Sequence, residues 1–126
     1  MFYTGDIIRE SLRDPSVLDA FAGYLVEART ATVENFTPSL WHIGRYRLPH
    51  EQVSALTARL VHNINQAQWY VHFYSETSDG MYVVLSGRIF KLPKYRDPSW
   101  DEMIAYGESV GVGRYWTENI PVDFAS

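Results

Sequence analysis

Apolar residues recur every three or four positions in three segments of the chain, which is the spacing of one buried helical stripe. The spacing predicts helices over residues 15–29, 50–64 and 98–109. The stripes consist of Val17, Leu18, Phe21, Tyr24, Leu25 and Ala28 in the first segment, Val53, Leu56, Thr57, Leu60 and Ile64 in the second, and Trp100, Met103 and Ile104 in the third.

The tetrapeptide RDPS occurs twice, at residues 13–16 and 96–99, directly before two of these stripes. An aspartate at a helix start accepts hydrogen bonds from the free amide groups of the first turn. Proline suits the first helical position because that position needs no amide hydrogen. Both copies are therefore interpreted as helix starts, with Asp14 and Asp97 as the capping residues.

Strand-like segments rich in aromatic and β-branched residues separate these helices. Residues 39–49 predict one strand, residues 28–33 a short edge strand, and residues 68–90 a hairpin around a glycine-containing turn. The stretch GDIIRESL, residues 5–12, shows a weak signal for a helical turn.

This order of elements predicts one α+β domain over residues 1–126. We expect a small three- to four-stranded, mostly antiparallel sheet with about three helices packed on one face. If the strands at 40–48 and 68–76 are parallel, the helix between them is a crossover of ordinary length.

The hydrophobic pattern favours one of two registers for the hairpin, because a slip of one residue moves every side chain to the other face. A two-residue loop at Asp79 and Gly80 would mix apolar and polar side chains on the inner face. A three-residue loop over residues 78–80 places Trp69, Val71 and Phe73 beside Ile89, Gly87 and Leu85 instead. The second register is expected.

In that register the outer face of the hairpin carries rings and polar groups, and it is the candidate binding surface. Surfaces of this kind mark interfaces and ligand grooves. We expect a homo-oligomer, most simply a homodimer, formed through this face, with a solvated face or a groove for a protein or small-molecule ligand as alternatives. The candidate binding residues are Tyr70, His72, Tyr74, Tyr82 and Arg88.

Composition narrows the choice of partners and compartment. The net charge of −4 disfavours nucleic acid and anionic membranes, because both attract positive proteins. The chain has no cysteine, and no secretory leader or membrane span is evident, so a cytoplasmic location is expected. The basic stretch RIFKLPKYR, residues 88–96, is interpreted either as a solvated segment or as an anion-binding patch.

Four histidines raise the question of a metal site, but none of their spacings matches a known ligand pattern. We therefore expect neither a metal nor a cofactor. The strand at 40–48 has two plausible registers, of which one places His42 beside His72 and the other buries it. Acid–base catalysis at His72 would need a carboxylate from elsewhere, such as Glu118 or Asp123.

Two functions remain open from the sequence. The first is a non-catalytic interaction or ligand-binding module that uses the aromatic sheet face. The alternative is a small enzyme with His72 as general acid or base, in a groove formed by the sheet and the C-terminal tail. The tail, residues 113–126, is expected to wrap over the domain and complete the core.

Overall fold

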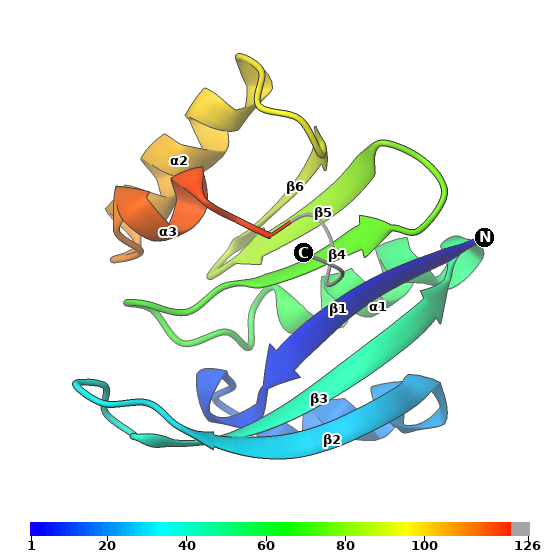
Figure 1. The fold of residues 1–126 in the computed structure, drawn as a ribbon, viewed down its shortest axis with the longest axis vertical. Helices are drawn as coiled ribbons and strands as arrows, with labels where there is room; N and C mark the ends of the chain where they lie inside the picture. The colour runs from blue at the N-terminus through cyan, green and yellow to red at the C-terminus, as the bar shows by residue number, and fades with distance from the viewer. Residues whose placement is uncertain (122–126) are drawn as a thin grey trace.

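One six-stranded antiparallel sheet organises the chain, in the strand order β2-β3-β1-β4-β5-β6 (Figure 1). The structure is a computed structural model, and it describes residues 1–121. The strands are β1 (Phe2–Ile8), β2 (Leu25–Thr32), β3 (Leu40–Pro49), β4 (Val71–Ser75), β5 (Gly80–Leu85) and β6 (Arg88–Pro93).

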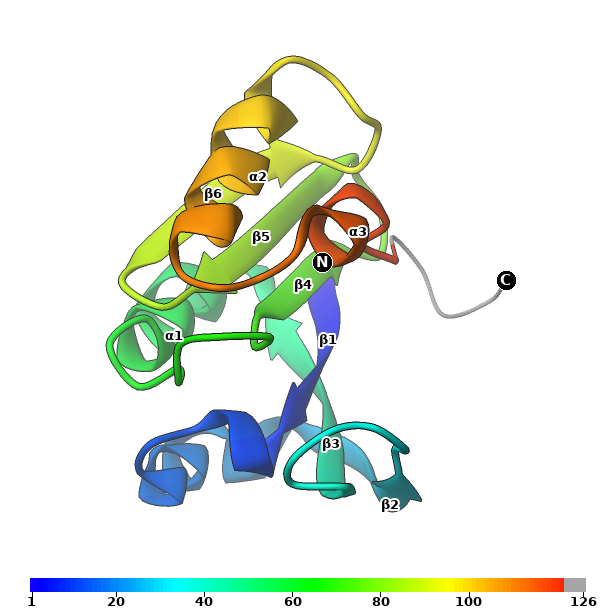
Figure 2. The ribbon, with the colours of Figure 1, turned by 90° about the vertical axis from the view of Figure 1, so that its left-hand side faces the viewer.

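Helices lie against both faces of this sheet (Figure 2). Three are α-helices: α1 (Val53–Leu60), α2 (Ser99–Ser109) and α3 (Arg114–Glu118). Three are 3₁₀ helices: Arg9–Ser11, Pro15–Tyr24 and His50–Gln52. Within the described part of the chain, no helix is both long enough and apolar enough to cross a membrane.

The expectation of three or four strands with helices on one face is therefore wrong, although the α+β class is correct. Residues 2–8, where the sequence suggested at most a helical turn, form strand β1. The expected second half of the hairpin divides into β5 and β6, because the chain turns at Ser86 and Gly87. Gly87 has a φ of 91°, a left-handed conformation that glycine adopts without strain.

Strand β1 is central, since it pairs with both β3 and β4. Tyr3 stands opposite Leu48 of β3 on one side and Ser75 of β4 on the other. Because β1 is antiparallel to both neighbours, β3 and β4 are parallel to each other with β1 between them. The connection from β3 to β4 contains helix α1 and passes over β1. The sequence did not predict that a strand lies between these two.

The observed hairpin matches neither of the two registers considered. A loop over residues 76–79 joins β4 to β5, and Val71 pairs with Val84 while Phe73 pairs with Tyr82. Odd- and even-numbered residues, whose side chains point to opposite faces, are both buried along β4 and at the end of β5. This part of the sheet therefore has no polar face. Alternation of polar and apolar residues therefore carried no information about the register.

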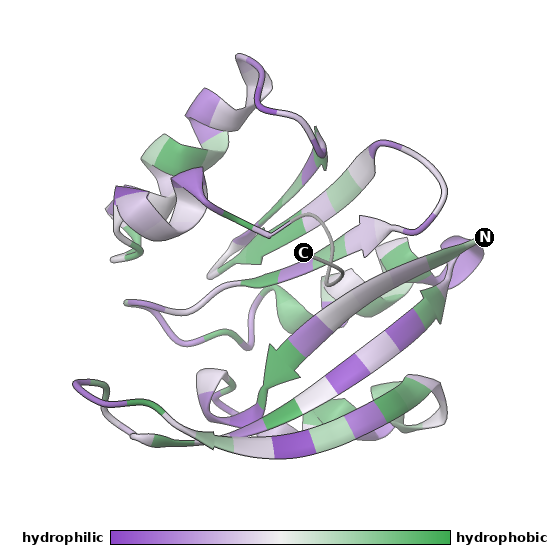
Figure 3. Cartoon of the chain, viewed as in Figure 1, coloured by the Kyte–Doolittle hydropathy of each residue, from purple (hydrophilic) through white to green (hydrophobic). Residues whose placement is uncertain are grey.

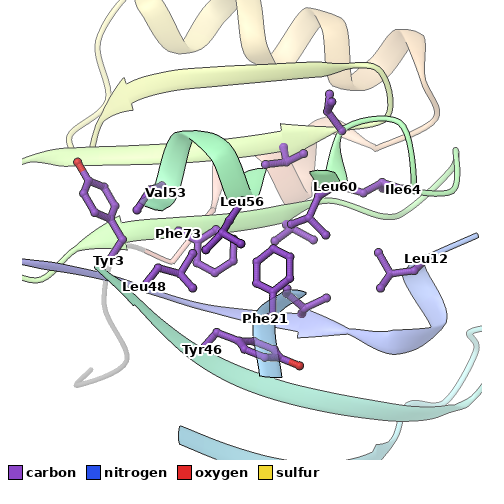
Figure 4. Packing of buried hydrophobic residues seen from close by; sticks show 14 of the residues in the cluster. Tyr3, Leu12, Phe21, Tyr46, Leu48, Val53, Leu56, Leu60, Ile64 and Phe73 are labelled. Atoms are coloured by element: carbon purple, nitrogen blue, oxygen red, sulfur yellow. The ribbon is translucent and has the colours of Figure 1, made fainter. Parts of the chain in front are cut away.

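The first core lies between the sheet and α1 with the 3₁₀ helix Pro15–Tyr24, on what we call the α1 face (Figure 4). Phe21, Leu60 and Phe73 are fully buried there. The buried members are Tyr3, Ile7, Leu12, Phe21, Tyr46, Leu48, Val53, Leu56, Leu60, Val61, Ile64, Trp69, Val71, Phe73 and Val84.

The second core lies between β4–β6 and the helices α2 and α3, on what we call the α2 face. Tyr74 is only 6% exposed in this core, although the sequence placed it on an outer surface. The buried members are Tyr74, Met81, Val83, Leu85, Phe90, Leu92, Trp100, Met103, Ile104, Val112 and Ile120. Figure 3 shows green apolar bands on β5 beneath α2 and purple polar bands along β1–β3.

The helices agree with the sequence best at their starts. The Asp14 and Asp97 carboxylates accept hydrogen bonds from the amides of Ser16 and Ser99, 3.0 Å and 2.9 Å long, as expected for both RDPS copies. The first helix ends at Tyr24, because the chain continues as edge strand β2.

The remaining segments depart from their expected lengths to different degrees. The second helical segment is shorter than expected, whereas α2 matches its predicted range within one residue. Of the tail, Thr117 and Ile120 are buried, and residues 122–126 lie outside the described part.

Helix α1 offers a direct test of the first core. Leu60 is fully buried, whereas its neighbour Arg59 is exposed. Leu60→Ala should lower the free energy of unfolding by about 2 to 5 kcal/mol, because it leaves a cavity, while Arg59→Ala should change it by less than about 0.5 kcal/mol. Urea unfolding would measure both, and equal losses would contradict the assigned face of α1.

A second test concerns the close approach of β1 to β4. A methyl group on Gly5 would lie 2.1 Å from the carbonyl oxygen of His72 and 2.6 Å from Cδ1 of Phe73. Gly5→Ala should therefore cost about 3 kcal/mol or more, since buried backbone has to move. Gly23→Ala is the matched control because nothing lies within 4 Å of its added carbon. Thermal unfolding of the two variants should differ clearly, and similar melting temperatures would contradict the packing at Gly5.

Candidate functional site

An aromatic pocket opens beside the α2 face, where three connecting segments meet over β1 and β4. Its walls come from the β2–β3 loop, the first residues of β3, the segment between α1 and β4, and helix α3. The pocket has a volume of about 170 Å³. It is lined by Asp6, Ile8, Phe36, Trp41, Gln68, Trp69, Tyr70, His72 and Trp116.

Three of the four tryptophans in the chain line this pocket. Their rings meet one another and Phe36 at steep angles. Phe36 lies 5.4 Å from Trp41 and 6.1 Å from Trp116, with interplanar angles of 78° and 67°. Trp41 lies 5.2 Å from Trp69 at 58°. Rings in these edge-to-face and tilted arrangements hold one another in place, so the aromatic walls are preorganised.

The backbone beside the pocket is held in an uncommon conformation. Ala67 and Gln68 have φ values of 63° and 55°, in the left-handed region that residues with a Cβ rarely adopt. Their amides donate to the carbonyls of Val110 and Gly111, over 2.8 Å and 3.1 Å. The Gln68 side chain donates to the carbonyl of Thr37, 3.3 Å away. Strained backbone is often retained at functional sites, and here it places three lining residues, 68–70.

Gly111 permits this arrangement. It has a φ of 92°, and an added Cβ would lie 2.7 Å from Cα of Ala67. A side chain at position 111 would therefore separate the end of α2 from the segment that carries Trp69. The pocket thus depends on a contact between two connecting segments that are far apart in the sequence.

His72 forms part of the pocket wall and is almost fully enclosed, with 8% of its surface exposed. Its ring lies between those of Tyr70 and Tyr74, with centroids 6.0 Å and 6.2 Å away. Burial lowers the pKa of His72 to about 4, against the smaller opposing effects of a backbone hydrogen bond at Pro121 and of the Asp6 carboxylate. His72 is therefore neutral at pH 7.

One ring nitrogen of His72 is buried without a partner. Proline has no amide hydrogen, so the backbone group of Pro121 that raises the pKa of His72 is its carbonyl. Nε2 of His72 is buried and has no hydrogen-bond partner among the described residues. A buried polar atom without a partner is costly, so this part of the pocket wall is a candidate for a functional role.

A group of ion pairs lies beside the pocket, around the lining residue Asp6. Asp6 pairs with Arg29 and Arg45, at 3.2 Å and 3.0 Å, and Arg45 also lies 3.7 Å from Glu27. These residues continue onto the part of the sheet formed by β1, β3 and β2. Asp6 is the one ionisable group among the lining residues that is charged at pH 7.

The structure brings together three of the five residues predicted from the sequence. Tyr70 and His72 line the pocket, and Tyr74 stacks on His72 from the second core. Tyr82 lies on the α1 face instead, 5.4 Å from the ring of Tyr3. Arg88 is the first residue of β6 and forms an ion pair with Glu102 of α2. A binding role for the first three stays a prediction, and the five residues do not form one site.

Several lining residues were not identified from the sequence: Asp6, Ile8, Phe36, Trp41, Gln68, Trp69 and Trp116. The concentration of tryptophan is the one available signal, because three of the four converge here. Their spacing along the chain does not indicate that convergence.

His42 and Glu118, which the sequence suggested as neighbours of His72, contact other residues instead. His42 is exposed on β3, where its Nδ1 lies 2.8 Å from a carboxylate oxygen of Glu10, so neither predicted environment of His42 is correct. Glu118 pairs with Arg114, and Asp123 lies outside the described part. Within residues 1–121, no group of three or more His, Cys, Asp or Glu side chains is placed to hold a metal ion.

Comparison of the chain with models of protein families, with curated proteins and with solved structures finds no match. Function is therefore inferred from the geometry and chemistry of this pocket.

The buried His72 predicts a pH dependence of stability. Its pKa is about 4 in the folded protein and about 6.5 when exposed, so the unfolded chain binds more protons between these values. Stability should therefore rise with pH across this window and be lost as pH falls, by roughly 3 kcal/mol in total.

Replacement of the imidazole isolates this contribution from that of other groups. Urea unfolding of wild type and His72→Phe from pH 7 to about pH 4 should show the wild type losing roughly 3 kcal/mol more than the variant. Stability profiles that run parallel over the whole range would show that His72 is not buried in the neutral form.

Proposed function

We propose that the protein is a small-molecule binding module, and that the aromatic pocket is its ligand site. The observation that carries the proposal is the convergence of three tryptophans, Phe36 and Tyr70 around one open volume. Ligand pockets combine mainly apolar and aromatic walls with a few polar groups, as Asp6, Gln68 and His72 supply here.

The size of the pocket limits the ligand. A cavity of about 150 Å³ accommodates one benzene molecule, and this pocket has about 170 Å³. A ligand of one ring, or two small fused rings near the open side, matches this volume. Ring stacking contributes about 0.5 to 1.5 kcal/mol per aromatic pair beyond the burial of apolar area.

Two features favour binding over catalysis by His72. A general acid or base works best with a pKa near the operating pH, whereas the pKa of His72 is about 4. No carboxylate among the described residues accepts a hydrogen bond from its ring. The histidine is better suited to shape the pocket wall than to exchange protons at neutral pH.

The homo-oligomer predicted from the sequence needs a different surface. Tyr74 is covered by the second core and Tyr82 belongs to the α1 face, so the expected aromatic patch does not exist as one exposed surface. Self-association itself was predicted only through that face, and it stays a prediction.

Nuclear magnetic resonance of ¹⁵N-labelled protein tests the ligand site with unlabelled indole as the probe. The indole N–H signals of Trp41, Trp69 and Trp116 should shift together on titration. Trp100 serves as an internal control, because it belongs to the second core and does not line the pocket. Equal shifts at all four tryptophans, or none at the three pocket residues, would contradict the proposal.

A pair of variants extends this test. Trp116 lines the pocket yet is 44% exposed, so Trp116→Ala should weaken indole binding by about three- to tenfold with little loss of stability. Tyr95→Ala is the matched control, since Tyr95 is 61% exposed and lies outside the pocket. An unchanged affinity for indole in Trp116→Ala would show that Trp116 is not part of the binding site.

A further inference from the structure

We propose that the ligand of the aromatic pocket is an organic cation, a compact methylated ammonium group held against the ring faces. This inference rests on the proposed function, because it specifies the chemistry of the same site. Its support comes from the kind of rings, from the charges that line the pocket and from the shape of its walls.

The rings are of the type that attracts cations. The face of an aromatic ring is electron-rich, and tryptophan has the strongest attraction for an ammonium group. Trp41, Trp69 and Trp116 supply three such rings, and Phe36 and Tyr70 supply two more. Several rings around one volume form an aromatic cage, an arrangement suited to quaternary ammonium groups that cannot donate hydrogen bonds.

The charges of the lining residues also favour a cation. No lysine or arginine lines the pocket, and Asp6 is its one charged side chain at neutral pH. His72 adds no positive charge there, because its burial favours the neutral ring. A cation entering the pocket therefore meets a carboxylate and ring faces, with no lining group that repels it.

Asp6 plays a secondary part in this scheme. Arg29 and Arg45 already pair with its carboxylate, so part of its negative charge is offset. Preference for a cation should then depend mainly on the rings. That distinction can be measured, because the rings and the carboxylate can be replaced separately.

The shape of the cage suits a rounded group. Phe36 stands at 78° to Trp41 and at 67° to Trp116, so neighbouring walls meet at steep angles. A flat ligand stacks on one wall at a time, whereas a trimethylammonium group contacts several walls at once. The volume of about 170 Å³ accommodates such a head group.

The test compares choline with 3,3-dimethyl-1-butanol, which has the same shape without the charge. Binding is followed through the indole N–H signals of the pocket tryptophans, with Trp100 as internal control. Choline should bind about tenfold more tightly than the neutral alcohol. Equal affinities, tighter binding of the alcohol, or binding of indole alone would overturn the cation inference and leave the ligand site intact. Failure of indole as well would overturn both.

Variants at Trp116 test whether its ring causes the preference for choline over the neutral alcohol. Trp116→Leu keeps an apolar side chain but removes the ring, so the ratio of the two affinities should fall several-fold. Trp116→Phe keeps a ring and should retain most of the ratio. A ratio that is the same in both variants as in the wild type would overturn the assignment of the preference to this ring.

Asp6→Asn should reduce choline binding only about two- to threefold, because the carboxylate is shared with two arginines. Glu76→Gln is the matched control. Glu76 also pairs with an arginine, Arg47, at 2.9 Å, but it does not line the pocket. Equal losses in the two variants would show a general charge effect and would overturn a role for Asp6 at the cation. Circular dichroism confirms that each variant is folded.

Discussion

The insertion of β1 between β3 and β4 is the contact on which the rest of the fold depends. It joins two parts of the sheet, β2–β3 and β4–β6, which share no other strand pair in the described part of the chain. It also requires Gly5, where any side chain would collide with the carbonyl oxygen of His72. The same strand contributes Tyr3 and Ile7 to the first core and Asp6 to the pocket. One strand thus connects the stability of the domain to the placement of the candidate site.

The two cores explain why His72 is enclosed. α1 packs on one face of β4 and the α2–α3 pair covers the other side of the sheet, so residues of both parities along β4 are removed from water. An imidazole in this position is held neutral because the charged form would lose its hydration. The arrangement that makes His72 a weak base also keeps this ring of the pocket wall uncharged at neutral pH.

The pocket is assembled by connections, whereas the sheet beneath it is regular. Gln68 belongs to a left-handed stretch of backbone that is anchored to the end of α2, Trp69 directly follows it, and Trp116 comes from α3. Loops placed on a rigid scaffold commonly carry binding residues. A cage built from rings that touch one another needs little rearrangement on binding, which lowers the entropic cost of holding a small ligand.

The sequence by itself determined the local features: the α+β class, the aspartate–amide hydrogen bonds at the start of both RDPS helices, the range of α2 and the strand at residues 40–49. These depend on spacing, propensity and capping, which act over a few residues. The tertiary structure alone decided that residues 2–8 form the central strand, that residues 80–93 divide at Gly87, and that helices cover both faces. It also brought Phe36, Trp41, Trp69 and Trp116 together, because long-range packing depends on which surfaces meet, and a single chain's periodicity does not encode that pairing.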